Sequence, residues 1–281
     1  MNKKELKEAL EFTKELSIKA GEKLLKFSRK LERLQLTHKQ GIGVATNADT
    51  AVEKFILKNI KKKYPNHLFM AEESFTGQSV EDLADSFNSN IYWLIDPLDG
   101  TNNFITGFPY YCTSMALSIN GEIKLGVVYR PSNGDLFYAV EGGGAYYQNL
   151  LTDKRPKKIK ILNNEKKTSD CVFISEILPK NISSRKEGYI RYKNISDNSR
   201  GLRRLGSAAL DMCYVAHGMF DGYWQSKLFP WDYAGAYVIC KESNVRVTCY
   251  KGEPFTPLQQ SILVARSPLF DKIIRLMHGN S

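Results

Sequence analysis

The chain has 281 residues, which is enough for one large domain or for two compact halves that share a cleft. Hydrophobic residues make up 42% and charged residues 25%, and no apolar run reaches the about 18 residues of a membrane span. The N-terminus lacks the apolar core of a signal peptide, so we expect a globular cytoplasmic protein. The net charge of +10 comes from dispersed lysines without interleaved aromatic residues, which argues against nucleic-acid binding as the main function. A basic regulatory protein that binds RNA or a polymerase stays open as the alternative from a different class.

The first 150 residues predict helices packed on an antiparallel sheet. Apolar residues recur in steps of three and four between positions 3 and 34, which is typical of an amphipathic helix. A second helix is expected to begin after Thr46 or Asn47 and to end before Pro65. Segments rich in β-branched and aromatic residues predict strands at 67–71, 91–95, 112–119, 123–130, 136–140 and 145–147.

From residue 151 onward, strands and helices alternate, which is typical of an α/β unit. The expected strands are 157–162, 171–177, 221–225, 245–250 and 261–265, and the expected helices are 206–218, 231–241 and 268–278. We therefore divide the chain into an α+β half, residues 1–150, and an α/β half, residues 151–281.

Two acidic residues stand at the end of the predicted buried strand of the first half. Asp96 and Asp99 flank Pro97 and Leu98, and the proline stiffens the backbone between them. Gly100 permits a tight turn, so both carboxylates are expected to point into the same space. Neighbouring carboxylates repel each other unless a cation separates them, and carboxylate oxygens are ligands that suit Mg²⁺. The segment therefore predicts a magnesium site, beside which the N–H groups of a helix start would bind a phosphate.

Acidic residues also follow two other apolar segments. Glu72 and Glu73 come after the strand predicted at 67–71, and Asp232 stands behind Trp231 at a predicted helix start. Taken singly, each acid is explained about as well by a structural role as by a functional one. The structural role would be a solvated strand end for Glu72 and Glu73 and an N-cap or first-turn acid for Asp232. Taken together, acids at the ends of three apolar segments indicate one site, which begins in the first half and is completed by the second.

Two motifs are similar to the signatures of the inositol monophosphatase family. The first signature resembles residues 93–104, WLIDPLDGTNNF, and the second resembles residues 230–236, PWDYAGA. Further family segments resemble residues 44–49, 71–74 and 206–212, so the similarity extends over about residues 5–270. The order and separation of the two signatures are highly specific. The small residues 234–236 are expected to allow close packing of a helix.

The resemblance implies a layered α-β-α-β-α sandwich of the inositol monophosphatase and fructose-1,6-bisphosphatase type, which combines α+β and α/β features. It also implies a lithium-sensitive phosphatase that uses two or three Mg²⁺ ions per active site and forms a homodimer. The implied metal ligands are the side chains of Glu72, Asp96, Asp99 and Asp232 and the carbonyl group of Leu98.

The resemblance assigns further residues to water activation and to substrate binding. Asp49, Glu73 and Thr101 would hold and deprotonate the attacking water. The backbone N–H groups of Gly100 and Thr101 would bind the phosphate. The other residues implied to contact the substrate are Gly206, Ser207, Ala208, Gln225 and Asp232.

One position departs from the family pattern. Members that cleave inositol phosphates usually carry a glutamate seven residues before the aspartate of the second signature, where this chain has Gln225. Glutamine still bonds to a hydroxyl, but it brings no charge and adds donors. We therefore expect a Mg²⁺-dependent phosphomonoesterase that uses metal-activated water on a small polyol or sugar phosphate similar to inositol 1-phosphate. The alternatives within the family are fructose 1,6-bisphosphate and 3′-phosphoadenosine 5′-phosphate, the latter with Tyr223, Trp224 and Phe229 as an adenine-stacking surface.

Overall fold

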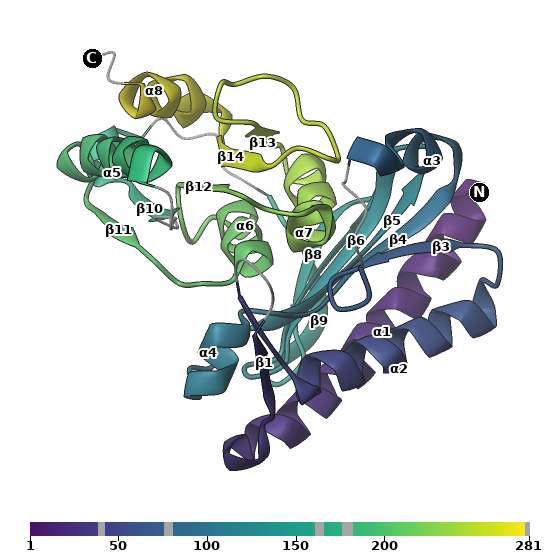
Figure 1. Ribbon diagram of the computed structural model, residues 1–281. Coiled ribbons are helices and arrows are strands. Elements are labelled where there is room, and N and C mark those ends of the chain that lie inside the picture. Colours follow the sequence, from purple (N-terminus) through teal and green to yellow (C-terminus); the bar gives the residue numbers. More distant parts are fainter. Residues whose placement is uncertain (39–42, 76–80, 161–165, 176–181, 279–281) are drawn as a thin grey trace.

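The computed structural model describes residues 1–38, 43–75, 81–160, 166–175 and 182–278. Helices α1 (Lys3–Ser28) and α2 (Asn47–Lys63) cover the outer face of a seven-stranded sheet (Figure 1). Helices α6 (Ala208–His217) and α7 (Pro230–Glu242) lie between this sheet and a five-stranded sheet. Helices α5 (Ile182–Asp197) and α8 (Ser267–Met277) lie on the outer side of the smaller sheet. The predicted α-β-α-β-α sandwich is thereby confirmed.

The larger sheet has the strand order β3-β4-β5-β6-β7-β8-β9. Its strands are β3 (Leu68–Ala71), β4 (Ile91–Asp99), β5 (Cys112–Ile119), β6 (Glu122–Arg130), β7 (Asp135–Val140), β8 (Gly144–Asn149) and β9 (Asp153–Lys158). Strand β3 runs parallel to β4, and the other neighbouring pairs are antiparallel. Because β3 and β4 are parallel, their carboxyl ends lie at the same edge of the sheet.

The smaller sheet has the strand order β11-β10-β12-β14-β13. Its strands are β10 (Val172–Ser175), β11 (Gly201–Arg203), β12 (Gly222–Ser226), β13 (Val245–Thr248) and β14 (Ser261–Arg266). Strand β10 runs parallel to β11 and β12, whereas β14 is antiparallel to β12 and β13. The remaining elements are the hairpin β1 (Leu36–His38) and β2 (Val44–Thr46), the helices α3 (Ala84–Ser89) and α4 (Thr101–Thr106), and the 3-10 helices η1 (Leu31–Arg33), η2 (Glu81–Leu83) and η3 (Thr168–Asp170).

Helix α2 begins where the sequence places an N-cap. The Thr46 side chain accepts the N–H of Ala48 at 3.1 Å, and the Asp49 carboxylate accepts the N–H of Thr46 at 2.7 Å. These bonds close a capping box, and the apolar stripe that includes Ile56 and Ile60 is buried beneath it. The cap fixes Asp49 in the first turn, with its side chain fully buried.

Helix α7 packs on the larger sheet through backbone contacts. A methyl group added to Gly126 of β6 would lie 2.0 Å from the carbonyl oxygen of Gly235, and one added to Gly235 would lie 2.6 Å from Ser114 Oγ. No side chain therefore separates the helix from the sheet at this point. The prediction that small residues at 234–236 allow close packing is confirmed.

Several boundaries differ from the sequence predictions. Helix α1 ends at Ser28 rather than near residue 34, because a turn and the 3-10 helix η1 follow it. Strand β4 continues through Asp96 to Asp99, since pairing with β5 resumes after an irregularity. Strand β9 pairs with β8, so the larger sheet extends beyond residue 150, and the division of the chain there stays a prediction.

Helix α5 and the β1–β2 hairpin were not predicted. The sequence of α5 has no continuous apolar stripe, because apolar residues such as Tyr189 and Ile190 are exposed among polar ones instead of lying on one buried face. The strands predicted at 157–162 and 171–177 fall partly outside the described residues. Within the described ranges, no helix is long and apolar enough to cross a membrane.

Candidate active site

The carboxyl end of β4 carries Asp96 and Asp99 and contains a break in strand pairing. Asp96 pairs with Ser114 and Asp99 with Cys112, so the register shifts between the two acids. The Asp96 carboxylate accepts the N–H of Leu98 at 2.9 Å, which closes a tight local turn. Both acids therefore stand at the edge of the sheet where β3 also ends.

Gly100 forms the tight turn between β4 and α4. Its φ is +94°, and a methyl group at this position would lie 2.9 Å from the carbonyl oxygen of Tyr110. Helix α4 then begins at Thr101, as the sequence predicted for a turn after the acids. The N–H groups of Gly100 and Thr101 thus stand at the start of this turn, and their binding of phosphate stays a prediction.

The four acidic side chains predicted as metal ligands come together between the two sheets. Glu72 follows β3, and its N–H donates to the carbonyl oxygen of Ile95 in β4 at 3.1 Å. Burial raises the pKa of Asp96 well above its ordinary value. The charges of Glu72, Asp99 and Asp232 raise this pKa further, which places all three near Asp96.

Asp99 connects the end of β4 to the start of α6. Its carboxylate accepts the hydroxyl of Ser207 at 2.7 Å and the backbone N–H groups of Ala209 at 2.8 Å and Ala208 at 3.3 Å. Burial raises the pKa of Asp99 to about 6, although these hydrogen bonds act in the opposite direction. Ser207, predicted to line the substrate side, is buried and instead holds this carboxylate.

Asp232 approaches the same region from the first turn of α7. Its carboxylate accepts the backbone N–H of Phe229 at 2.7 Å, which is a helix-capping bond. The capping interpretation of this acid is therefore confirmed. A single carboxylate offers further lone pairs, so capping and metal binding are compatible, and the metal role stays a prediction.

A second cluster lies where α2 meets the end of β4. Asp49 accepts the hydroxyl of Thr46 at 2.5 Å, and the hydroxyl of Thr101 lies 3.1 Å from the other Asp49 oxygen. Burial raises the pKa of Asp49 to about 6, and the charges of Glu73 and Glu72 add to the rise. The three residues predicted to activate water, Asp49, Glu73 and Thr101, are therefore neighbours.

Sequence reasoning missed Glu53 as a support of this cluster. The buried Glu53 carboxylate accepts the backbone N–H of Glu73 at 2.7 Å. Burial raises the pKa of Glu53, and nearby charges contribute to the rise. The bond between Glu53 and Glu73 spans 20 positions, so it leaves no local pattern in the sequence.

A cavity of about 390 Å³ opens beside these acids. It is lined by Asp99, Asn102, Asn103, Arg204, Leu205, Gly206, Ala208, Gln225, Leu228 and Asp232. Four of the residues predicted to contact the substrate therefore line this cavity, namely Gly206, Ala208, Gln225 and Asp232. The predicted metal ligand Asp99 lines it as well. Arg204, Leu205 and Leu228 were not predicted to line a site, although the first two directly precede the segment 206–212 that resembles the family.

Asn103 ties the two sides of the cavity together. Its side-chain amide donates to the carbonyl oxygens of Leu205 at 2.7 Å and Tyr110 at 2.8 Å. The residue belongs to the first signature, but its partner Leu205 comes from the second half of the chain. This bond positions the segment before α6 against the start of α4.

The donor set suits magnesium. Glu72, Asp96, Asp99 and Asp232 offer only carboxylate oxygens, and a divalent cation would relieve the repulsion that raises the pKa of Asp96. In the part of the chain that the structure describes, no three such side chains already form a cage that could hold a metal ion. The charges of Glu72, Asp99 and Asp232 nevertheless act on Asp96, so the four acids are neighbours.

The aromatic residues considered for adenine stacking divide into two groups. Tyr223 and Trp224 are buried within the hydrophobic cores, as expected of packing residues. Phe229 is 48% exposed and stacks on Trp231 with ring centroids 4.8 Å apart. None of the three lines the cavity beside the acids.

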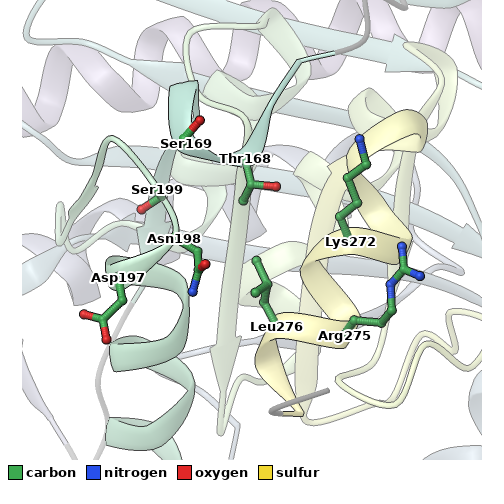
Figure 2. A pocket seen from close by; sticks show the side chains of 8 residues that line it. All are labelled: Thr168, Ser169, Asp197, Asn198, Ser199, Lys272, Arg275 and Leu276. Carbon is green, nitrogen blue, oxygen red and sulfur yellow. The ribbon is translucent and has the colours of Figure 1, made fainter. Parts of the chain in front are cut away.

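A separate cavity of about 450 Å³ lies between η3 and the ends of α5 and α8 (Figure 2). Asp197 and Asn198 at the end of α5 line one side of it, and Lys272 and Arg275 of α8 line the other. η3 directly precedes β10, and β10 runs parallel to β12, whose last residues carry Gln225. This cavity is therefore at the opposite edge of the smaller sheet from the acids.

Comparisons with known proteins agree with this arrangement. The model of the inositol monophosphatase family matches residues 5–280. The Nus factor SuhB of Vibrio cholerae is 34% identical over 268 residues and 94% of each chain is covered. The inositol-1-monophosphatase of Rhizobium meliloti is 30% identical, with 92% of this chain and 91% of the relative covered.

A solved structure shares the whole architecture. The extragenic suppressor protein suhB from Bartonella henselae superimposes with a TM-score of 0.82 at 29% sequence identity. The match covers 94% of this chain and 95% of the solved one. The family model spans nearly all residues, and Asp99 and Asp232 of the two signatures line one cavity, so the chain belongs to the inositol monophosphatase family.

Proposed function

We propose that the protein is a Mg²⁺-dependent phosphomonoesterase that hydrolyses a small polyol or sugar phosphate. The observation that carries the proposal is the gathering of acids from both halves of the chain beside a cavity of about 390 Å³. A cavity of this size fits a small metabolite. Oxygen ligands of this kind suit magnesium rather than a softer metal.

The magnesium ions would be held by Glu72, Asp96, Asp99, Asp232 and the Leu98 carbonyl group. Bound there, they supply the positive charge that phosphate ester hydrolysis requires and lower the pKa of water. The N–H groups of Gly100 and Thr101 orient the phosphate at the start of α4. These roles follow from the family signatures and from the positions of the residues.

Proton transfer belongs to the cluster at α2. The hydroxyl of Thr101 has two acceptors within reach, an Asp49 oxygen at 3.1 Å and the Leu98 carbonyl oxygen at 3.0 Å, and in this proposal its proton goes to Asp49. The pKa of Asp49 is raised to about 6, so this carboxylate is close to the range in which a general base is effective. Thr101 takes the proton of the attacking water as it passes its own to Asp49. Glu73, held by its backbone bond to Glu53, lies beside this path and orients the water.

The alcohol part of the ester would lie against Gly206, Ala208 and Gln225. Ser207 does not line the cavity but positions Asp99 through the hydrogen bond that its hydroxyl donates. Release of inorganic phosphate from a panel of phosphorylated metabolites, with and without Mg²⁺, tests the proposal. The panel includes inositol 1-phosphate, fructose 1,6-bisphosphate and 3′-phosphoadenosine 5′-phosphate.

The expected result is phosphate release that requires Mg²⁺ and is inhibited by Li⁺. Asp99→Asn should fold and lose nearly all turnover, and a variant with the wild-type rate would contradict the assignment of Asp99 as a ligand. Salt-sensitive binding of RNA without any phosphate release would favour the regulatory alternative. Light scattering on the same preparation tests the predicted homodimer.

A further inference from the structure

The first turn of helix α6 is capped by a carboxylate of β4. The Ser207 side chain, at the N-cap position, is bonded to Asp99 instead of to its own helix, and its hydroxyl donates to Asp99 Oδ2 at 2.7 Å. Asp99 also accepts the N–H groups of Ala208 at 3.3 Å and Ala209 at 2.8 Å, which have no acceptor within an α-helix. Asp99 therefore does the work of an N-cap residue. The position of its carboxylate and the position of the start of α6 consequently depend on each other.

Tyr110 holds this same turn of α6. It lies between α4 and β5, and its hydroxyl donates to Asp211 Oδ1 at 2.6 Å. The N–H of Asp211 donates to the Ser207 carbonyl oxygen at 2.9 Å, at the start of α6. Tyr110 is 5% exposed and Asp211 is fully buried, so water does not compete for the bond between them. Burial raises the pKa of Tyr110 well above its ordinary value, and the charge of Asp211 raises it further, so the hydroxyl remains a donor.

Tyr110 itself is fixed from the side of the larger sheet. Arg130, the last residue of β6, donates through Nε and Nη2 to the carbonyl oxygen of Pro109 at 3.0 and 2.6 Å. Its guanidinium carbon lies 4.9 Å from the centroid of the Tyr110 ring, which is a cation–π distance. The Tyr110 carbonyl oxygen accepts the Asn103 amide at 2.8 Å, which adds a bond to α4. The Tyr110 hydroxyl is thus a fixed point against which α6 is placed.

Tyr214 bonds α6 to the larger sheet one turn further along the helix. Its hydroxyl donates to Asp135 Oδ2 at 2.6 Å, and Arg130 Nη1 donates to that hydroxyl at 2.8 Å. Tyr214 is 4% exposed, so its hydroxyl matches that of Tyr110 in burial and in having a carboxylate acceptor. Tyr110 acts on the turn that bonds to Asp99, whereas Tyr214 acts on the turn behind it.

We propose that Tyr110 is a positioning residue of the metal site, whose hydroxyl holds the start of α6 through Asp211 and thereby places the Asp99 carboxylate. The inference rests on the proposed function, because it takes Asp99 as a magnesium ligand. Without the hydroxyl, the first turn of α6 can shift, and the Asp99 oxygens shift with the N–H groups that they accept. Mg²⁺ demands near-ideal octahedral geometry, so it should bind more weakly. The cavity wall at Gln225 belongs to β12 and keeps its place, so KM for the ester should not change.

Tyr110→Phe removes the hydroxyl and keeps the ring. From the rise of the melting temperature with Mg²⁺ concentration, which does not depend on turnover, we expect Kd for Mg²⁺ to increase about tenfold. The Mg²⁺ concentration for half-maximal phosphate release should increase by the same factor. At saturating Mg²⁺, KM for the ester that the wild type hydrolyses fastest should stay within about twofold.

Two further variants separate positioning from a merely structural role. Asp211→Asn keeps an oxygen that accepts the Tyr110 hydroxyl, so Kd for Mg²⁺ should stay within about threefold of the wild-type value. Adding Tyr110→Phe to Asp211→Asn should again weaken Mg²⁺ binding about tenfold, and this pair leaves no buried charge that has lost a donor. Tyr214→Phe is the matched control, which should lower the melting temperature without Mg²⁺ and leave Kd for Mg²⁺ unchanged.

The outcomes distinguish the inference from the proposed function. A Kd for Mg²⁺ that changes less than about twofold in Tyr110→Phe, or an equal weakening in Tyr214→Phe, would overturn the inference and leave the phosphatase function standing. A wild-type protein that neither binds Mg²⁺ nor releases phosphate in its presence would overturn the proposed function and the inference with it.

Discussion

The two sides of the cavity are built in different ways. On the metal side, Asp96, Asp99 and Asp49 each accept backbone N–H groups, so their positions follow from the path of the chain. On the alcohol side, the exposed Arg204 and the partly exposed Gln225 reach the cavity through long side chains. If the proposed function holds, we expect a substitution on the first side to change the rate of the reaction and a substitution on the second side to change which substrate is preferred.

The largest effect is expected from Asp96→Asn. Asparagine keeps an oxygen that accepts the Leu98 N–H but loses the charge, so the turn should survive while kcat/KM falls by at least about 10³-fold. Phosphate release and circular dichroism measure these two quantities. Asp271→Asn, which removes an exposed acid paired with Arg246, should leave the rate unchanged. A loss below about tenfold would remove Asp96 from the metal side.

A smaller loss of activity is expected from Thr101→Val, which tests the proposed path of the proton from water through Thr101 to Asp49. Valine matches the shape of threonine but lacks the hydroxyl, so kcat should fall by about 10²-fold with little change in KM. Thr101→Ser restores the hydroxyl and should recover most of the rate. Equal rates for the serine and valine variants would show that the hydroxyl carries no proton.

Gly126→Ala tests whether α7, which carries Asp232, is held at a fixed distance from the larger sheet, which carries Asp96 and Asp99. Its methyl group would lie 2.0 Å from the Gly235 carbonyl oxygen, so α7 must shift, and the free energy of unfolding should fall by about 1–3 kcal/mol. Urea denaturation measures this loss. Gly201→Ala, where the methyl group meets only the Arg203 side chain at 3.2 Å, is the control. Equal stability of the two variants would mean that α7 tolerates displacement.

The smallest effect concerns the pH dependence of stability in a chelating buffer. The pKa of Asp99 is raised from 3.8 to about 6, so the folded state favours its protonated form. Its contribution to stability is present below its unfolded pKa and is lost as the pH rises through its folded pKa. Asp99→Asn stays neutral, so the melting temperature of the wild type relative to this variant should fall by a few degrees between about pH 4 and pH 7. A relative rise would contradict the direction of the shift.

Sequence alone predicted the metal side better than the alcohol side. Asp49 and Asp232 stand at helix starts, where local capping patterns place them, and Asp96 ends an apolar strand. The bond between Ser207 and Asp99 joins residues 108 positions apart, and no local pattern contains it. The orientation of Gln225 likewise depends on the buried hydroxyl of Tyr223, which the sequence presents only as an aromatic residue.

The helices and strands show the same contrast between features with a local sequence pattern and features without one. Periodic or β-branched segments such as α2 and β5 were predicted closely, because burial of one face leaves a pattern in the sequence. Helix α5 was missed because it packs mainly at the periphery against α8, where few apolar residues are needed.

The glycine contact between α7 and β6 sets a limit on how this protein can move. Asp232 belongs to α7, and Asp96 and Asp99 belong to β4 of the sheet against which α7 packs, backbone against backbone, at Gly126 and Gly235. Main-chain atoms have no rotamers to change, so the distance between Asp232 and the acids of β4 is set by a rigid contact. If the proposed function holds, we expect substrates of different size to be accommodated at the rim of the cavity rather than by movement of α7 away from the sheet.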